Sequence, residues 1–251
     1  MIITGILEKH KSSLDIGDDN FYNGEKFFGG MILKDEIKTK LANLNFDDLP
    51  EELCGFKLNK IFAADEDKFI FFTYANDETH CAVKTYFHEE TQEFKVSQRI
   101  GLTEFCLTNF FTEDFAHFKE LINIGIGDVI KNLRDLKTKK LNAFLSEKKI
   151  DTWTYGLDLP PTLEGFELFI SPAAPVEVTN GSFIVINYVD FAINSDFVLY
   201  YNIYTDEFSG ERRLNGAPHV VYTFDAKTLN ELEGKLRDNL ADELKAIRNK
   251  I

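Results

Sequence analysis

The chain has few of the residues and motifs that usually reveal a protein's chemistry. Its 251 residues include three cysteines, six prolines, two methionines and a single tryptophan. The cysteines, Cys54, Cys81 and Cys106, are odd in number and form no C-x-x-C pair, which argues against a disulfide framework. We therefore expect reduced thiols in a cytoplasmic protein. Residues 1–7 lack a basic start and a cleavage site, so no signal peptide is predicted.

Catalytic and metal-binding signatures are equally scarce. None of the five histidines stands in an H-x-x-x-H or H-E-x-x-H frame, and no G-x-S-x-G occurs. The G-x-G at Gly125 and Gly127 falls inside an expected helix, where close helix packing is a better interpretation than phosphate binding. The sequence thus predicts no catalytic residue, no metal site and no cofactor. An enzyme whose site is assembled from distant residues stays an alternative.

Positive charge and long apolar runs are also in short supply. Lysine and arginine number 28 against 42 acidic residues, so the formal net charge is −14. Such a charge repels phosphate backbones and anionic lipid, and we expect neither nucleic acid nor membrane as a partner. No apolar stretch approaches the roughly 18 residues of a membrane span. The acidic residues are spread along the chain, which favours a role in solubility and leaves a basic partner as the alternative.

Aromatic residues are abundant, and the chain repeats itself. Its 24 phenylalanines and nine tyrosines favour strands over an all-helical bundle. The β-rich stretch 69–74 recurs as 183–188, and residues 49–58 match 159–168 at six of ten positions. The spacing between the copies grows from 110 to 114 residues, which places a four-residue loop insertion between Leu168 and Phe183.

Each copy has the pattern of an α+β module. Short strands with short connections predict an antiparallel meander of about five strands, which a long C-terminal helix follows and covers on one face. The fold prediction is therefore a tandem duplication of this module. The predicted divisions are an N-terminal extension (1–34), a first repeat (35–137) and a second repeat (138–251) that begins with a linker helix and connection (138–158).

The two long helices differ on one face. Both carry an apolar stripe at steps of three or four, which predicts packing on their own sheets. The first helix is apolar on a second face too, at Leu121, Ile124, Val129 and Leu136, where the second helix has charged residues. This face is predicted to pack against the second repeat, the N-terminal extension or another chain. The protein is accordingly a monomer with pseudo-two-fold repeats or a homodimer.

Three aromatic residues and two arginines are the remaining candidates for a site. Tyr86 and Tyr200 occupy equivalent positions and could line a groove between sheet and helix. Trp153 is expected to anchor the linker by burial, with ligand stacking as the alternative. Arg99 and Arg213 are also equivalent, and a structural ion pair is favoured over a ligand clamp.

The preferred functional hypothesis is a non-catalytic protein-interaction, adaptor or inhibitor module. The alternatives are a small-molecule binding module, with a pocket between sheet and helix or between the repeats, and the enzyme already mentioned. The acidic charge, the scarcity of motifs and the second apolar helix face favour the first hypothesis.

Overall fold

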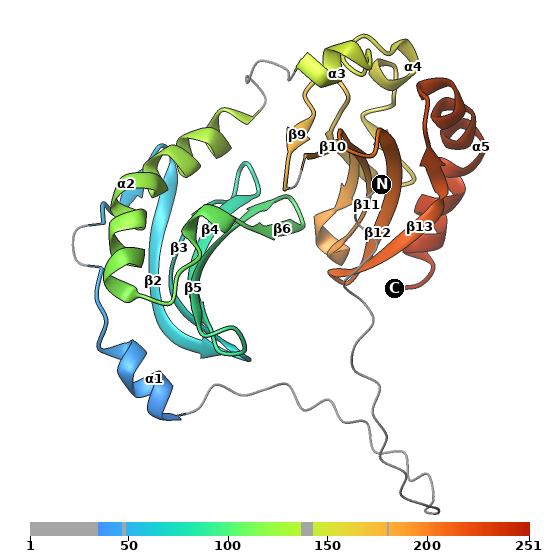
Figure 1. Cartoon of the computed structure of the whole chain (residues 1–251). Coiled ribbons are helices and arrows are strands. Elements are labelled where there is room, and N and C mark those ends of the chain that lie inside the picture. Colours follow the sequence, from blue (N-terminus) through green and yellow to red (C-terminus); the bar gives the residue numbers. More distant parts are fainter. Residues whose placement is uncertain (1–34, 47–48, 137–142, 180) are drawn as a thin grey trace, which may run out of the picture. The chain divides into compact units, whose positions relative to one another are not determined.

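A computed structural model describes residues 35–46, 49–136, 143–179 and 181–251 (Figure 1). The predicted N-terminal extension (1–34) and the start of the predicted linker helix (137–142) lie outside the described residues. The first repeat begins with a short helix, α1 (Asp35–Ala42).

The first repeat folds into one antiparallel sheet and a long helix. Its strands are hydrogen-bonded in chain order, so the predicted meander is confirmed. The sheet has six strands instead of about five, because a two-residue strand precedes the predicted set. A 3-10 turn, η1 (Thr108–Phe110), leads to the helix α2 (Phe115–Arg134). The strands are β1 (Glu52–Leu53), β2 (Phe56–Asp65), β3 (Lys68–Asn76), β4 (Cys81–His88), β5 (Glu93–Ile100) and β6 (Thr103–Cys106).

The second repeat has the same plan in a seven-stranded sheet. The order is β13-β12-β11-β10-β8-β7, and β9 pairs with β10 beside this path. Two short helices, α3 (Ala143–Glu147) and α4 (Thr154–Leu157), precede the sheet, and α5 (Leu229–Arg248) follows it. The strands are β7 (Thr162–Leu163), β8 (Phe166–Ile170), β9 (Val176–Glu177), β10 (Ser182–Asp190), β11 (Ser195–Asn202), β12 (Glu207–Leu214) and β13 (Ala217–Ala226).

A tight turn at the start of each sheet has the same backbone geometry in both copies. Cys54 and Gly55 have φ angles of 52° and 84°, and Glu164 and Gly165 have φ angles of 50° and 84°. Two consecutive residues with positive φ between paired strands form a type I′ hairpin turn. Glycine at the second position avoids the steric cost of a side chain there, which explains why the Gly-Phe pair recurs in both copies.

A buried tyrosine closes the same turn region in each repeat. The Tyr74 hydroxyl donates to the Pro50 carbonyl at 2.7 Å, and the Tyr188 hydroxyl donates to the Pro160 carbonyl at the same distance. Burial raises the pKa of both tyrosines above the ordinary value. These two tyrosines tie β3 and β10 to the proline that precedes the short first strand of each sheet.

The copies diverge where the insertion was predicted. In the first repeat β2 runs through ten residues and contains an irregularity near Phe62, whose φ is 47°. In the second repeat the chain leaves the sheet after β8, passes through residues 171–175 and returns as β9. Both β8 and β9 pair with β10, so together they occupy the place that β2 holds beside β3.

Each long helix packs its apolar stripe on its own sheet (Figure 1). Side-chain caps fix the helix starts: Asp114 accepts from the His117 amide at 2.7 Å, and Thr228 accepts from the Glu231 amide at 3.2 Å. A fully buried large apolar side chain contributes about 1.5–3 kcal/mol before entropy is counted. The buried stripes are Phe118, Ile122, Ile126, Ile130 and Leu133 in α2, and Leu232, Leu236, Leu240, Leu244 and Ile247 in α5.

The second sheet is covered by α5 on one face and in part on the other, where Val220 and Tyr222 of β13 are exposed. Alternate residues of its strands pack under α5, and residues of the other face, such as Ile184 and Val198, belong to the buried cluster of the first repeat. The His80 ring stacks on the Phe191 ring with centroids 3.6 Å apart, which adds a contact between the repeats.

Candidate functional site

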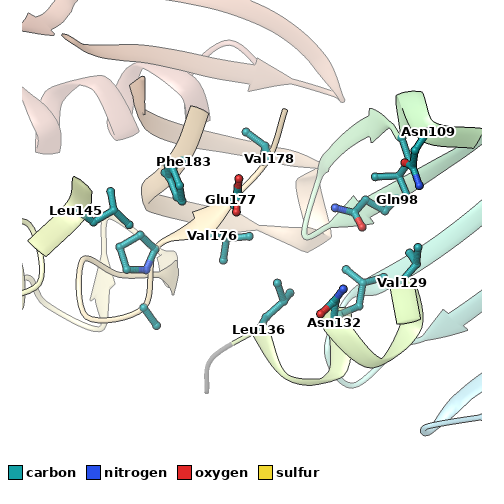
Figure 2. Close-up of a pocket in the computed structure, with 14 residues that line it drawn as sticks. Gln98, Asn109, Val129, Asn132, Leu136, Leu145, Val176, Glu177, Val178 and Phe183 are labelled. Carbon is teal, nitrogen blue, oxygen red and sulfur yellow. The ribbon is translucent and has the colours of Figure 1, made fainter. Parts of the chain in front are cut away.

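A cavity of about 670 Å³ lies between α2 and the β9 segment (Figure 2). Its volume falls within the roughly 300–1,000 Å³ of ligand-binding clefts. Apolar side chains and primary amides together form its wall. The lining residues are Gln98, Leu107, Asn109, Val129, Asn132, Leu133, Leu136, Leu145, Ala174, Pro175, Val176, Glu177, Val178 and Phe183.

One wall of the cavity comes from α2 and includes part of the predicted second apolar face. Val129 and Leu136 are half-buried and line the cavity, with the exposed Asn132 between them in sequence (Figure 2). Leu121 is half-buried against the first core and does not line the cavity. Ile124 does not line it either, and 73% of its surface is exposed. The four residues therefore separate in space, and the interface role of this face stays a prediction.

The opposite wall comes from β9 and the residues beside it. The Val178 amide donates to the Ser182 carbonyl at 2.9 Å, and Val176 pairs with Ile184. Because backbone groups alternate in direction along an antiparallel ladder, the N–H and C=O of Glu177 point away from β10. At β9 the sheet thus presents backbone groups that a further extended segment can pair with.

The polar groups of the cavity are mostly neutral amides. Gln98, Asn109 and Asn132 each carry a carbonyl oxygen and an NH₂ group, which can accept and donate. Glu177 is the sole ionisable residue among the lining residues. This chemistry suits a ligand with both donors and acceptors and disfavours a strongly anionic one.

The aromatic residues predicted to form a groove lie apart. Tyr86 is in β4 of the first sheet, Tyr200 is in β11 of the second, and Trp153 caps the start of α4. None of the three lines the cavity between α2 and β9. Trp153 is 7% exposed, and its Nε1 donates to Glu233 Oε2 at 3.2 Å. It therefore anchors the connection between the repeats by burial, as expected.

The two tyrosines lie on the sheet faces directed away from the long helices. Tyr86 alternates with the core residues Val83 and Phe87, and its hydroxyl lies 3.1 Å from Cys106 Sγ. Burial, reinforced by the contact with Cys106, raises the pKa of Tyr86. Burial also raises the pKa of Tyr200, against the opposing effect of the Arg213 charge. A groove between sheet and helix is not their location, since the helix sides of both sheets are packed cores.

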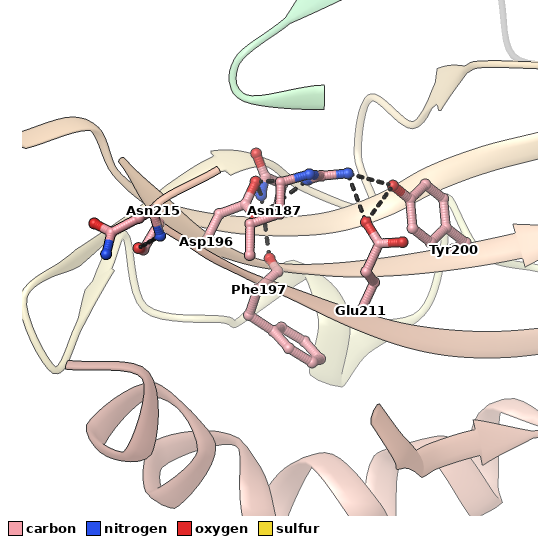
Figure 3. Close-up of polar contacts among 8 residues, drawn as sticks. Asn187, Asp196, Phe197, Tyr200, Glu211 and Asn215 are labelled. Carbon is pink, nitrogen blue, oxygen red and sulfur yellow. Dashed lines mark hydrogen bonds and ion pairs between the residues drawn. The ribbon is translucent and has the colours of Figure 1, made fainter. Parts of the chain in front are cut away.

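A buried polar network surrounds Arg213 on the second sheet (Figure 3). Its Nη1 donates to both carboxylate oxygens of Asp196, at 3.2 and 3.0 Å, and its Nη2 donates to Glu211 Oε1 at 2.6 Å and to the Tyr200 hydroxyl at 3.1 Å. Asn187 Nδ2 donates to Asp196 at 3.1 Å. The ion pair predicted for Arg213 is thus confirmed, with Asp196 and Glu211 as its partners.

The arginine that is equivalent in sequence has different surroundings. Within the part of the chain that the structure describes, no ion pair or hydrogen bond involves the Arg99 side chain. The ion-pair prediction, which covered both arginines, is therefore wrong for Arg99. The two arginines do occupy equivalent positions, each facing the equivalent residue of the neighbouring strand, but Ala82 stands where the second sheet has Asp196.

Three potential metal ligands meet at one end of the first sheet. Asp67, His88 and Glu90 place ligand atoms within 4.8 Å of one another. His88 Nε2 lies 3.0 Å from Asp67 Oδ2, and His88 Nδ1 lies 3.2 Å from the Thr91 hydroxyl. The sequence did not group them, because they come from two different turns that strand pairing brings together. The contacts of His88 with Asp67 and Thr91 explain this cluster, which stabilises the two turns.

Cys54, Cys81 and Cys106 form no disulfide in the part of the chain that the structure describes, and Cys81 is buried.

The comparisons with known proteins add no family to this description. The chain matches none of the protein-family models, curated proteins or solved structures with which it was compared. Among the described residues, no helix combines the length and the apolar character that a membrane span requires.

Proposed function

We propose that this chain is a binding module that holds an extended segment of another protein in the cavity between α2 and β9. The observation that carries the proposal is the geometry of β9, which turns the backbone N–H and C=O of Glu177 away from its own sheet. A strand added beside β9 would pair with these groups, which is the mode known as β-augmentation.

The side chains around β9 fit the same kind of ligand. An extended peptide directs successive side chains to opposite sides. Val129, Leu136 and Val178 offer apolar contacts for one set of these side chains. The amides of Asn109 and Asn132 can pair with peptide groups that do not reach β9.

Charge determines which peptides are favoured. The chain carries a net charge of −14, and Glu177 adds a carboxylate to the cavity wall. Opposite charge accelerates encounter and like charge suppresses it. The preferred partner is therefore an extended segment with alternate apolar residues and basic flanks. Such binding is compatible with an adaptor or an inhibitor and requires no catalytic group.

The proposal is tested by selecting peptides from a displayed random library on the full chain and measuring their affinities. We expect enrichment of basic peptides with alternate apolar residues. Val129→Asp places a charge in the wall and should weaken binding by at least about tenfold, or about 1.4 kcal/mol. Asn132→Ala should weaken binding without disturbing the core, since Asn132 is exposed.

Ile124→Asp is the matched control. It places the same charge on the same helix, at a residue that is 73% exposed and outside the cavity. We expect it to leave peptide affinity unchanged. Failure to select any peptide, or an equal effect of the two aspartates, would refute the proposal. Saturable binding of a small molecule in the cavity, with no peptide selected, would favour the alternative of a small-molecule binding module.

A further inference from the structure

A second cavity, of about 280 Å³, lies on the face of the first sheet directed away from α2. Its residues alternate along the strands with core residues such as Tyr74, Val83 and Val96. All of them belong to the first repeat, so this site is independent of the cavity beside β9. The lining residues are Thr73, Ala75, Ala82, Lys84, Ser97, Arg99 and Glu104.

The second sheet shows what an arginine at this place binds. Arg99 lies directly across from Ala82 in the strand pairing, as Arg213 lies across from Asp196. At the spacing of 114 residues that relates the two sheets, Ala82 corresponds to Asp196. Arg213 binds the Asp196 carboxylate with two hydrogen bonds. The first sheet has no counterpart of this carboxylate, because the methyl group of Ala82 does not fill the corresponding space.

The residues at the positions of Glu211 and Asn187 also differ in the first sheet. Ser97 stands where the second sheet has Glu211, and Thr73 stands where it has Asn187. Thr73 is a hydroxyl donor, as Asn187 is an amide donor to the buried carboxylate. The first sheet thus keeps the cation and a neutral donor and lacks both carboxylates that surround Arg213.

The charges of the cavity sum to one positive charge. Lys84 Nζ lies 3.0 and 3.1 Å from the two carboxylate oxygens of Glu104, so these two residues neutralise each other. Ser97 also donates to Glu104 at 2.6 Å. Arg99 is half-buried and faces Glu104 across the strand pairing, but among the described residues it forms no ion pair or hydrogen bond. A guanidinium that is partly removed from water without a partner is unfavourable, and a bound anion would relieve this.

We propose that this cavity binds a monocarboxylate, whose two oxygens take the place beside Arg99 that the Asp196 carboxylate takes beside Arg213. A guanidinium matches a carboxylate through two parallel hydrogen bonds. The carboxylate of Glu104 in the same wall disfavours a dianion such as phosphate. The net charge of −14 acts against anions at long range, but salt screens it beyond about 8 Å.

The direct test is an NMR titration of the full chain that follows the side-chain Nε–H resonance of Arg99. Sodium acetate is compared with sodium chloride and with sodium phosphate at equal ionic strength. We expect a saturable shift with acetate alone. An N-acetylated tripeptide with a free C-terminus and its amidated form distinguish a peptide C-terminus from a free small acid. Tighter binding of the free-acid peptide than of acetate assigns the site to peptide termini, and equal binding assigns it to small acids.

Ala82→Asp is the decisive variant, because it builds the Asp196 arrangement into the first sheet. We expect it to weaken acetate binding at least tenfold and to raise the melting temperature. Arg99→Gln removes the reporter resonance, so acetate binding to this variant is measured by isothermal titration calorimetry, and we expect it to be lost. Ala75→Asp is the control: it adds the same charge to the same wall, one strand further from Arg99, and should not raise the melting temperature. An absent shift at Arg99, an equal response to chloride, or a melting temperature lowered by Ala82→Asp would overturn the proposal.

Discussion

For the Asp196 carboxyl group, the effect of burial on the pKa is larger than the opposing effect of its charged and polar partners. Burial raises its pKa from 3.8 to about 6, although Arg213 and Asn187 favour the charged form. The folded chain therefore binds a proton at a higher pH than the unfolded chain does. The resulting stability is fully present below about pH 4 and is lost as the pH rises through about 6.

Arg213→Gln should destabilise the chain in a pH-dependent way. Near pH 8 the substitution leaves the buried Asp196 carboxylate uncompensated, and we expect a loss of about 3 kcal/mol in the free energy of unfolding. Near pH 5 the loss should be smaller by about 1 kcal/mol or more, since Asp196 then binds a proton in the folded state. Urea unfolding at the two pH values measures this difference.

Arg99→Gln serves as the internal control for that experiment. It removes the equivalent cation from the first sheet, where no aspartate lies opposite. We expect a change below about 1 kcal/mol at both pH values. Two results would contradict this account of the two arginines. One is an equal loss of unfolding free energy in both variants, and the other is a loss in Arg213→Gln that does not vary with pH.

At the scale of the helices, the two glycines of α2 have different roles. A Cβ on Gly125 would lie 2.9 Å from the Phe110 ring, whereas a Cβ on Gly127 would meet nothing within 4 Å. The close packing inferred from the sequence is therefore present at Gly125 and not at Gly127. The G-x-G motif alone cannot show which glycine is closely packed, because the contacting residue, Phe110, comes from η1, outside the helix.

This difference predicts opposite effects of alanine. Gly127→Ala should stabilise the chain by about 0.5–1 kcal/mol, since alanine restricts the unfolded backbone and favours the helix. Gly125→Ala should gain nothing or destabilise, because the new methyl group displaces the buried Phe110 ring. Thermal and urea unfolding of the two variants decide the matter, and stabilisation by both would show that α2 is not packed on Phe110.

The periodicity of apolar residues made the long helices and most strands predictable. Features that depend on strand pairing were not predictable from the sequence. The stripes of α2 and α5 follow from steps of three or four residues, and the meander follows from short connections. Strand β9 was not predicted, because Val176 and Glu177 stand among loop residues and acquire strand geometry only through pairing with β10. The network at Asp196 was missed for a similar reason, since its carboxylate meets Arg213 across a hairpin register.

At the scale of the whole molecule, the two similar sheets are used differently. On the face of the second sheet directed away from α5, residues of β8 to β11 pack against the first repeat, and the face holds a neutralised arginine. The corresponding face of the first sheet contains a cavity with an arginine that forms no ion pair among the described residues. The alignment of the two copies shows that the two arginines are equivalent. Only the packing of the side chains shows that the cavity lies beside Arg99 and not beside Arg213.

The cavity beside β9 likewise depends on the difference between the copies. The insertion separates β9 from β8, so that β9 takes the place of the second half of β2, and the second apolar face of α2 supplies the opposite wall through Val129 and Leu136. Only the apolar face of α2 has no equivalent in the other copy, since α5 carries charged residues at those positions. Binding is thus expected where the repeats have diverged and not where they agree.

The most direct measurement is residue-resolved hydrogen exchange of the full chain, free and saturated with a selected peptide. If the peptide adds a strand to β9, the Glu177 amide should become protected by about tenfold or more. The Val178 amide should change little, because it already donates to Ser182. Protection of Glu177 without a comparable gain at Val178 is the predicted result. An unprotected Glu177 amide in the saturated complex would contradict the account.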